Sequence, residues 1–405
     1  MEVKPGYKLT DVGVIPEDWE LRSIHEFSAI KTGPFGTLLK ASEYSESDGV
    51  PLISVGEIRQ GFLKITDHTP RISEAITRRL PQYVLRKGDI VFGRKGGVDR
   101  SALIEQLQDG WFLGSDGISI RPIQDCNREY VALQLQSARV QGWLLHNAIG
   151  TTMPSLNQEI LRNAVIAFPP TKAEQEAIAA ALSDVDALIA ALDRLIAKKR
   201  DIKQAAMQEL LTGKRRLPGF SGEWAVMRLE DITDCLDNLR IPLNDGQRNQ
   251  MKGDYPYCGA NGVLDYVNDY VIDDDIILMA EDGGYFDEYV YRPIAYRMIG
   301  KCWVNNHVHI LRAKKEYDQG FIFYCLVHKN ILSYLANGTR AKLNKSEMNK
   351  IEVLLPFEKD EQASIASVLS DMDAEIAALE ARSEKTRALK QGMMQELLTG
   401  RIRLV

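Results

Sequence analysis

The chain has 405 residues, of which 45% are hydrophobic and 26% are charged, and its formal net charge is −6 at pH 7. Such values are typical of globular proteins, so they exclude a disordered chain, and the length favours two or three domains over one. No window approaches roughly 18 consecutive apolar residues, so the sequence predicts no membrane span. The N-terminal stretch MEVKPGYKLTDVGVIPEDW has no apolar core segment, so no signal peptide is predicted either.

The five cysteines are widely spaced and form no CxxC pair. Neither a zinc ribbon nor a disulfide framework is indicated by this spacing. We therefore expect reduced, buried thiols and a cytoplasmic protein.

Residues 1–170 are expected to form a mixed α/β globule with short strands. The segments PLISVGEI, GDIVFG and GISIRPI are apolar and end at Gly, Pro or charged residues, which is typical of strands. Residues 130–147 favour a helix. A last strand in NAVIAFPP ends at Pro169 and Pro170, which cannot continue a sheet.

Residues 171–216 predict one long helix. Apolar residues recur at intervals of three and four, and Leu188 and Leu195 widen the stripe. Thr171 begins a capping box, and Gly213 follows the last periodic leucine, where a helix commonly ends. At 1.5 Å per residue the helix is about 60 Å long, which exceeds the diameter of a small domain.

Residues 217–357 predict a second α/β globule, with strands in VHILRA and EVLLPF and a helix over 320–335. Residues 358–405 then repeat the first long helix. At a constant offset of 187 positions, 26 of the 44 residue pairs between 174–217 and 361–404 are identical. This identity indicates an internal duplication. The globules correspond only in outline, for example GDIVFGRKGG with DDIILMAEDGG.

Each helix needs a partner for its apolar stripe, and the nearest candidate is the other copy. We therefore predict an antiparallel coiled coil with a pseudo-two-fold axis, whose C-terminal residues return to the first globule near Trp19. Two separate surface helices are the alternative. The residues predicted to pack between the helices are Ile178, Leu182, Val185, Ile189 and Leu192, and Ile365, Leu369, Met372, Ile376 and Leu379.

This layout resembles the specificity subunit of type I restriction–modification systems. The resemblance rests on KTGPFGTLLKASEY, GVPLISVGEI and GDIVFGRKGG in the first globule and on PYCGANGVLDYV and WVNNHVHIL in the second. Between them, paired prolines precede EQ, and QELLTGKRRLPGFSGEW follows. Each motif is loose, but their order, repeated twice, is specific and covers essentially the whole chain. The second copy departs from the pattern in having Glu358 in place of the capping Thr171.

The resemblance implies a mixed α+β fold with two α/β target-recognition domains, each of which recognises one half of a bipartite, asymmetric sequence in double-stranded DNA. It implies that the two helices separate these domains and dock two copies of a DNA adenine methyltransferase subunit, and that restriction subunits with motor and nuclease activity join this core. Residues 1–170 and 217–357 are then the recognition domains, and residues 171–216 and 358–405 are the spacer helices. We also expect the helices to set the spacer between the half-sites.

The residues themselves indicate no active site. An adenine methyltransferase needs a glycine-rich turn for its cofactor and an Asn/Asp-Pro-Pro-aromatic loop, and the nearest string, AFPP at 167–170, lacks the polar residue. No phosphate-binding loop occurs. His307 and His309 lie near Cys302, but no further ligands follow at zinc spacing, so a core or base-contacting histidine is favoured. We expect a non-catalytic subunit without cofactor or metal.

The charge distribution does not indicate strong DNA binding by the chain alone. Residues 1–170 carry a net charge of −1 and residues 218–358 carry −6, whereas phosphate contacts need cations. Either partner subunits supply the phosphate contacts while this chain recognises bases, or the protein is a coiled-coil scaffold that does not contact DNA. A free-standing DNA enzyme is a third hypothesis, which the missing motifs disfavour. A footprint of the complete assembly separates the first two.

The best candidates for DNA contacts are cations, amides and rings in glycine-rich loops, such as the basic turn GRKGGVDR. A solvated turn is the alternative for each. In the first globule the predicted DNA-binding residues are Lys31, Thr32, Lys40, Arg59, Arg94, Lys95, Arg100, Thr151 and Asn157. In the second globule they are Tyr257, Asn261, Asn305, Asn306, His307, Arg340, Lys342, Asn344 and Lys345.

Overall fold

The computed structural model describes residues 4–123, 126–150, 152–336 and 341–404. The chain separates into two compact units. Unit 1 comprises residues 1–191 and 382–405, and unit 2 comprises residues 192–381. Both mix helices and sheets, as predicted. Within the described ranges, none of the helices combines the length and the apolar character that crossing a membrane requires.

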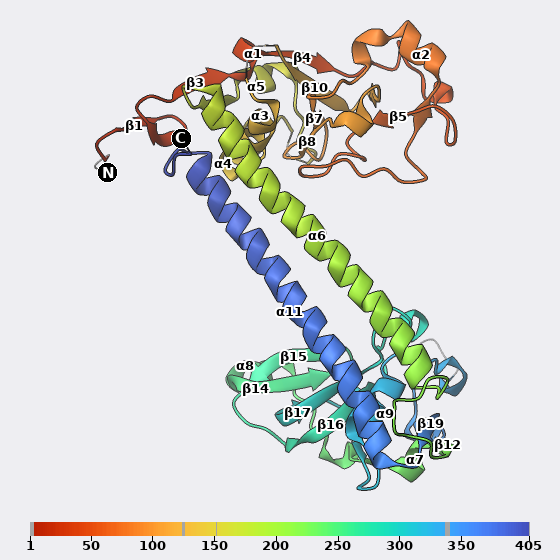
Figure 1. The fold of residues 1–405 in the computed structure, drawn as a ribbon. Coiled ribbons are helices and arrows are strands. Elements are labelled where there is room, and N and C mark those ends of the chain that lie inside the picture. Colours follow the sequence, from red (N-terminus) through yellow and green to blue (C-terminus); the bar gives the residue numbers. More distant parts are fainter. Residues whose placement is uncertain (1–3, 124–125, 151, 337–340, 405) are drawn as a thin grey trace. The chain divides into compact units, whose positions relative to one another are not determined.

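Unit 1 is built around a four-stranded antiparallel sheet in the order β4-β10-β7-β8 (Figure 1). A smaller sheet has the order β6-β5-β9, and β3 pairs with β11. The strands are β1 (Tyr7–Thr10), β2 (Gly13–Pro16), β3 (Glu20–Ser23), β4 (Ser28–Thr32), β5 (Val50–Ile53), β6 (Arg71–Ile72), β7 (Ile90–Gly93), β8 (Ser101–Leu103), β9 (Phe112–Leu113), β10 (Gly117–Pro122) and β11 (Val165–Phe168). The short helices are α1 (Ile24–Phe27), α2 (Glu74–Arg79), α3 (Arg128–Leu135), α4 (Ala138–Asn147) and α5 (Gln158–Asn163).

Unit 2 contains a six-stranded sheet in the order β13-β18-β16-β17-β14-β15, and a separate pair β12–β19. The strands are β12 (Trp224–Arg228), β13 (Thr233–Cys235), β14 (Lys252–Gly259), β15 (Gly262–Val267), β16 (Ile272–Ala280), β17 (Ala295–Val304), β18 (Val308–Ala313) and β19 (Glu352–Pro356). The short helices are α7 (Leu229–Ile232), α8 (Asp245–Gln250), α9 (Gln319–Leu326) and α10 (Lys345–Met348).

The two units share one order and pairing of strands, here called the strand plan, although their sequences have diverged. The run β13-β18-β16-β17 repeats β4-β10-β7-β8 with the same antiparallel pairings. The parallel pair β14–β17 repeats β5–β9, and β12–β19 repeats β3–β11. Aliphatic and aromatic residues together form the core of unit 1, where the rings of Phe27 and Phe168 meet edge to face with their centroids 5.0 Å apart.

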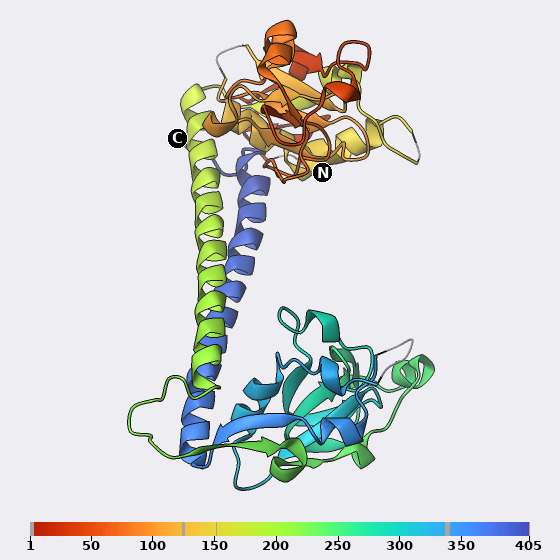
Figure 2. The same cartoon turned by 90° about the vertical axis from the view of Figure 1, so that its right-hand side faces the viewer.

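The two long helices are α6 (Lys172–Leu210) and α11 (Lys359–Leu397), each 39 residues and therefore about 58 Å long. The first part of α6, to Ala191, belongs to unit 1 and packs beside the last part of α11, whereas the reverse holds in unit 2 (Figures 1 and 2). In unit 2, Lys199 pairs with Glu375 and Lys203 with Asp373, so residue numbers rise along one helix while they fall along the other. The helices are therefore antiparallel, as predicted.

One ion pair between the two long helices occurs twice, once in each unit. Asp373 lies 2.5 Å from Lys203 in unit 2, and Asp186 lies 2.6 Å from Lys390 in unit 1. Both members of each pair are separated from their counterparts by the 187-residue offset. The repeat was therefore kept as a set of matching contacts.

Most residues of the predicted stripe are buried. Leu188 and Leu195 are 42% and 39% exposed, so the prediction that they widen the stripe was wrong. A stripe of residues three and four apart drifts around the helix, and these two fall on its solvent side. The fully buried residues are Ile178, Leu182, Ile365 and Leu369, the nearly buried ones are Ile189, Leu192 and Ile376, and the half-buried ones are Val185, Met372 and Leu379.

Both long helices are followed by a glycine in the left-handed region, as predicted, with φ of +68° at Gly213 and +69° at Gly400. Each glycine also packs against a tryptophan: a Cβ on Gly213 would lie 3.3 Å from Trp224, and one on Gly400 would lie 3.0 Å from Trp19. The C-terminal segment therefore returns to the entry of unit 1, which confirms the predicted return of the C-terminal residues to the first globule near Trp19.

Candidate nucleic-acid interface

The basic turn of unit 1 follows β7 and is fixed by its backbone. The amide of Arg94 donates to the carbonyl of Asp116 at 2.8 Å, and the amide of Leu156 donates to the carbonyl of Arg94 at 2.8 Å. The backbones of Lys95 and Ser155 form an isolated antiparallel β-bridge. The end of β7 is thus held between the start of β10 and the segment that precedes α5.

The end of β16 in unit 2 is held by the same set of backbone contacts, which we call the frame. The amide of Glu281 donates to the carbonyl of His307 at 3.0 Å, and the amide of Leu343 donates to the carbonyl of Glu281 at 2.7 Å. The backbones of Asp282 and Lys342 form an isolated antiparallel β-bridge. These contacts repeat those of unit 1 at the same positions in the strand plan, and they confirm the predicted correspondence of the segments around residues 94 and 281.

Equivalent positions carry opposite charges in the two units. The frame places Arg94 and Lys95 of unit 1 where unit 2 has Glu281 and Asp282. One backbone arrangement therefore presents cations in unit 1 and carboxylates in unit 2. Cations donate hydrogen bonds and carboxylates accept them, so the two turns differ in the groups that they can bind.

The cations of the unit 1 turn are accessible. Lys95 and Arg100 are exposed and Arg94 is half-buried. The ammonium of Lys95 is 4.0 Å from Asp116, and the guanidinium of Arg94 lies 5.4 Å from the centroid of the Phe35 ring. A cation–π contact of this kind orients a guanidinium while it leaves the charge uncompensated.

The remaining unit 1 candidates differ in how their side chains are engaged. Lys40 is exposed, and Lys31 lies 5.1 Å from the Tyr83 ring centroid. Arg59 donates to the carbonyls of Gly56 and Ile58, at 2.7 and 3.0 Å, and Thr32 accepts a hydrogen bond from Gln158. The Asn157 side chain caps α5 by accepting from the amide of Ile160 at 2.8 Å. Thr151 lies outside the described residues.

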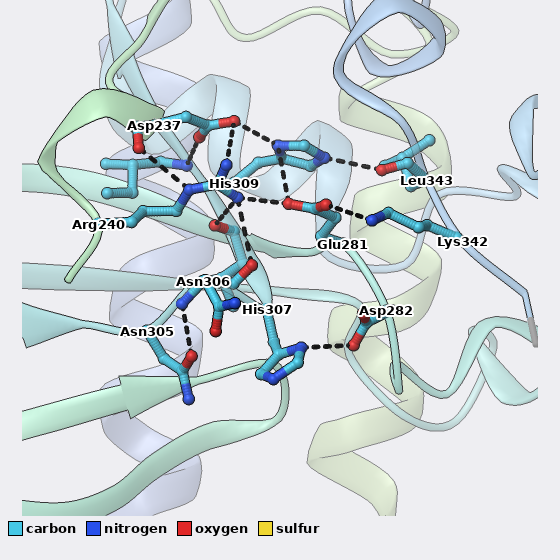
Figure 3. Close-up of polar contacts among 12 residues, drawn as sticks. Asp237, Arg240, Glu281, Asp282, Asn305, Asn306, His307, His309, Lys342 and Leu343 are labelled. Atoms are coloured by element: carbon cyan, nitrogen blue, oxygen red, sulfur yellow. Dashed lines mark hydrogen bonds and ion pairs between the residues drawn. The ribbon is translucent and has the colours of Figure 1, made fainter. Parts of the chain in front are cut away.

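In unit 2 the acidic turn is half-buried, and Glu281 belongs to an ionic network (Figure 3). Glu281 accepts from Lys342 at 2.9 Å and also pairs with Arg240, which donates to the carbonyl of Val308 at 3.1 Å. Burial raises the pKa of Glu281, but the hydrogen bonds from Lys342 and Arg240 outweigh this effect and hold the pKa below its usual range. Glu281 thus stays ionised and fixes the position of Lys342.

His309 lies at the centre of this network. Its Nδ1 is 2.7 Å from the Asp237 carboxylate and its Nε2 is 2.8 Å from the Leu343 carbonyl (Figure 3). Burial alone would lower the pKa of His309, but the hydrogen bonds to Asp237, Cys235 and Leu343 raise it to about 9. Cys235, Asp237 and His309 have donor atoms within 4.8 Å of one another. Both imidazole nitrogens are already hydrogen-bonded, so these three residues fit an ion-pair network better than a metal site.

His307 lies apart from His309 (Figure 3) and lines an open cleft of about 670 Å³. Its Nδ1 lies 2.8 Å from Asp282, and the cleft wall also includes Asn305, Asn306 and Arg248. Asn306 is exposed and Asn305 is 8% exposed. Three consecutive residues that were predicted to bind DNA thus line one cleft, together with Asn244, Asp245 and Arg248, whose donors and acceptors suit base edges.

Tyr257 cannot contribute to such a surface, and its prediction as a DNA-binding residue was wrong. Its side chain is fully buried, and its hydroxyl accepts from the amide of Leu243 at 2.9 Å. The guanidinium of Arg248 covers the ring at 5.3 Å. Tyr257 lies on β14 opposite Trp303 of β17, so the parallel pairing places it in the core.

The other unit 2 candidates lie in exposed turns. Asn261 donates to the carbonyl of Gly283 at 2.9 Å, which ties the β14–β15 turn to the acidic turn. Asn344 and Lys345 are exposed at the start of α10, where Asn344 is the N-cap residue. Arg340 lies outside the described residues. The residues of the site that were not predicted include Arg240, Arg248 and Phe35, because none of them stands out in sequence from ordinary surface residues.

Known proteins are similar to this chain in sequence. The family model described as the type I restriction modification DNA specificity domain matches residues 16–199 and 221–387. The type I restriction enzyme MjaX specificity subunit of Methanocaldococcus jannaschii is 26% identical over 98% of this chain and 97% of its own length. A type I specificity subunit of Haemophilus influenzae is 33% identical over a stretch that covers 35% of each chain.

Solved structures have the same fold. The S subunit of a type I restriction–modification system from M. genitalium aligns with a TM-score of 0.64 at 15% identity and covers 98% of both chains. A chain from another type I system aligns with a TM-score of 0.58 at 16% identity and covers 96% of this chain and 99% of its own length. With two repeats of the family domain over most of its length, this chain belongs to the family of type I restriction–modification specificity subunits.

Proposed function

We propose that each unit recognises one half of a bipartite, asymmetric DNA target on behalf of catalytic partner subunits. The observation that supports this proposal is the shared frame with unlike side chains, in which Arg94 and Lys95 stand where unit 2 has Glu281 and Asp282. A common scaffold positions both turns in the same way, and different side chains select different bases. Two unlike turns imply two unlike half-sites.

The partners in this proposal are two copies of a DNA adenine methyltransferase subunit, joined by restriction subunits. The interhelical pairs Asp186–Lys390 and Asp373–Lys203 support it, because a duplicated helix pair offers the same surface twice. Two identical subunits would occupy two identical surfaces. The relative described as part of a type I system is consistent with such an assembly.

Recognition without catalysis is the third part of the proposal. The chain lacks the cofactor turn and the base-pocket motif of an adenine methyltransferase. Methyl transfer from labelled S-adenosylmethionine is therefore expected from the complex and not from the purified chain. Transfer by the chain without its partner would contradict this.

The test of half-site recognition uses the complex purified with its methyltransferase subunits, after its target has been mapped by sequencing methylated adenines in host DNA. Changing Arg94, Lys95 and Arg100 to Ala should relax selection of one half-site, since each base contact contributes about 1–3 kcal/mol. Selection of the other half-site should be unchanged. Equal loss at both halves, or no loss at either, would contradict the assignment of one half-site to unit 1.

A further inference from the structure

An exposed aromatic ring stands beside the basic turn of unit 1. The Phe35 side chain is 57% exposed at the start of a tight turn after β4, where the Phe35 carbonyl accepts from the amide of Leu38 at 2.8 Å. The turn is held at both ends: the amide of Gly33 donates to the carbonyl of Gly117 at 3.0 Å, and Leu39 is buried. A Cβ on Gly33 would lie 1.8 Å from the Gly114 carbonyl oxygen, so the chain approaches this close only with glycine. The ring is therefore presented to solvent by a fixed backbone.

The ring and the Arg94 guanidinium form one unit. They lie 5.4 Å apart, and among the described residues the Arg94 side chain makes a single long hydrogen bond, to the Ser115 carbonyl at 3.5 Å. The ring thus orients the guanidinium and leaves most of its donors available. A guanidinium with available donors can bind the O6 and N7 atoms of guanine together.

Unit 2 shows that the fold does not require an exposed ring at this position. There β13 ends at Cys235 and a short 3-10 helix over Asp237–Leu239 follows, so the tight turn of unit 1 is not repeated. Arg240 comes directly after this helix, and its side chain is only 20% exposed and is engaged by Glu281. The turn residue Glu281 of unit 2 therefore contacts a guanidinium, whereas Arg94 of unit 1 contacts an aromatic ring.

We propose that Phe35 and Arg94 together recognise a guanine with a neighbouring thymine in the half-site of unit 1. Arg94 donates to the guanine, and the ring of Phe35 packs on the 5-methyl group of the thymine. A phenyl ring cannot hydrogen-bond to a base edge, and that methyl is the apolar group in the major groove. Adjacent bases are about 3.4 Å apart, so a ring and a guanidinium in contact can meet neighbouring bases. This inference rests on the proposed function.

The experiment replaces thymines of this half-site, one at a time, by deoxyuridine, which lacks only the methyl group. Binding of the complete complex to each duplex is measured. The wild-type complex should bind one such duplex about fourfold more weakly, as expected for the loss of one buried methyl group. Phe35→Ala should bind the thymine duplex with the same loss and show no further loss with deoxyuridine. Leu38→Ala removes another exposed apolar side chain of the same turn (45% exposed) and should keep the wild-type ratio.

Three outcomes overturn the inference: a wild-type complex that does not distinguish the two bases, a Phe35→Ala complex that keeps the wild-type ratio, or a half-site without a thymine next to a guanine. Unchanged affinity for the other half-site shows that the variants are folded. The triple variant of Arg94, Lys95 and Arg100 distinguishes a failure of the proposed function from a failure of this inference alone. If it leaves the half-site unaffected, the proposed function fails, whereas a normal triple-variant effect with an unchanged ratio in Phe35→Ala refutes only this inference.

Discussion

Arg216 donates two hydrogen bonds to the carboxylate of Glu361, at 2.5 and 2.7 Å, across 145 positions of the chain. Glu361 is fully buried at the start of α11, and the guanidinium lies 5.6 Å from the Trp224 ring centroid. The duplicate of this pair is Arg403 with Glu174 in unit 1. Each unit is therefore closed by the same ion pair between the residues after one long helix and the first turn of the other.

Removing the arginine of this pair should destabilise unit 2. Arg216→Ala leaves the Glu361 carboxylate buried without its partner, which typically costs about 3 kcal/mol or more. The free energy of unfolding, measured in urea on the full chain, should fall by that amount. The control is Arg215→Ala, since Arg215 is 74% exposed and 3.6 Å from Glu209. Equal effects of the two substitutions would show that the buried pair contributes nothing particular.

The stability of unit 2 should depend on pH through His309. Its folded pKa of about 9 lies above the ordinary 6.5, so protonation favours the folded state. The contribution, up to about 3 kcal/mol, is complete below pH 6.5 and is lost as the pH rises through 9. We expect the difference in unfolding free energy between the wild-type chain and His309→Gln to shrink between pH 6 and pH 10. A constant difference would mean that His309 is neutral in the folded protein.

His307 should affect recognition without affecting stability. It is half-exposed at the cleft, and its ring offers a donor or acceptor to a base edge. His307→Ala should therefore relax selection in the half-site of unit 2 and leave the half-site of unit 1 unchanged. Competition binding of the complex with duplexes altered at single base pairs measures this.

Tyr257→Phe is expected to lower the stability of unit 2 without affecting recognition of DNA. Loss of the hydroxyl leaves the amide of Leu243 buried without its acceptor, which costs about 1–3 kcal/mol. Unfolding free energy should fall while base selection by the folded complex stays as in the wild type. Altered selection with normal stability would return Tyr257 to the DNA-binding surface.

The long helices should act as a ruler between the half-sites. Inserting one heptad after Leu192 and another after Leu379 lengthens each helix by about 10 Å and keeps the apolar register. At 3.4 Å per base pair, the preferred spacer should grow by roughly three base pairs. Methylation of duplexes with spacers lengthened by one to four base pairs measures this. If the paired variant still prefers the original spacer, the helices are only docking surfaces.

The sequence by itself determined the repeat and the long helices. Helix periodicity is local, so residues such as Ile178 and Ile365 mark the buried face without knowledge of the fold. The glycines that end both helices were likewise predictable, because the left-handed conformation there favours glycine. Duplication then supplied the partner for each stripe, since two copies of one helix can form matching contacts.

Only the tertiary structure decided which loop residues are available to DNA. Tyr257 and Asn261 are four positions apart, yet one is fully buried and the other exposed. The pairing of Arg94 with Phe35, and of Lys342 with Glu281, depends on strands that are distant in sequence. Strand order and register set these contacts, and a one-residue shift in register would reverse the face of every side chain. Composition and spacing carry no record of that register, so residue type alone could not separate a structural ion pair from a free donor.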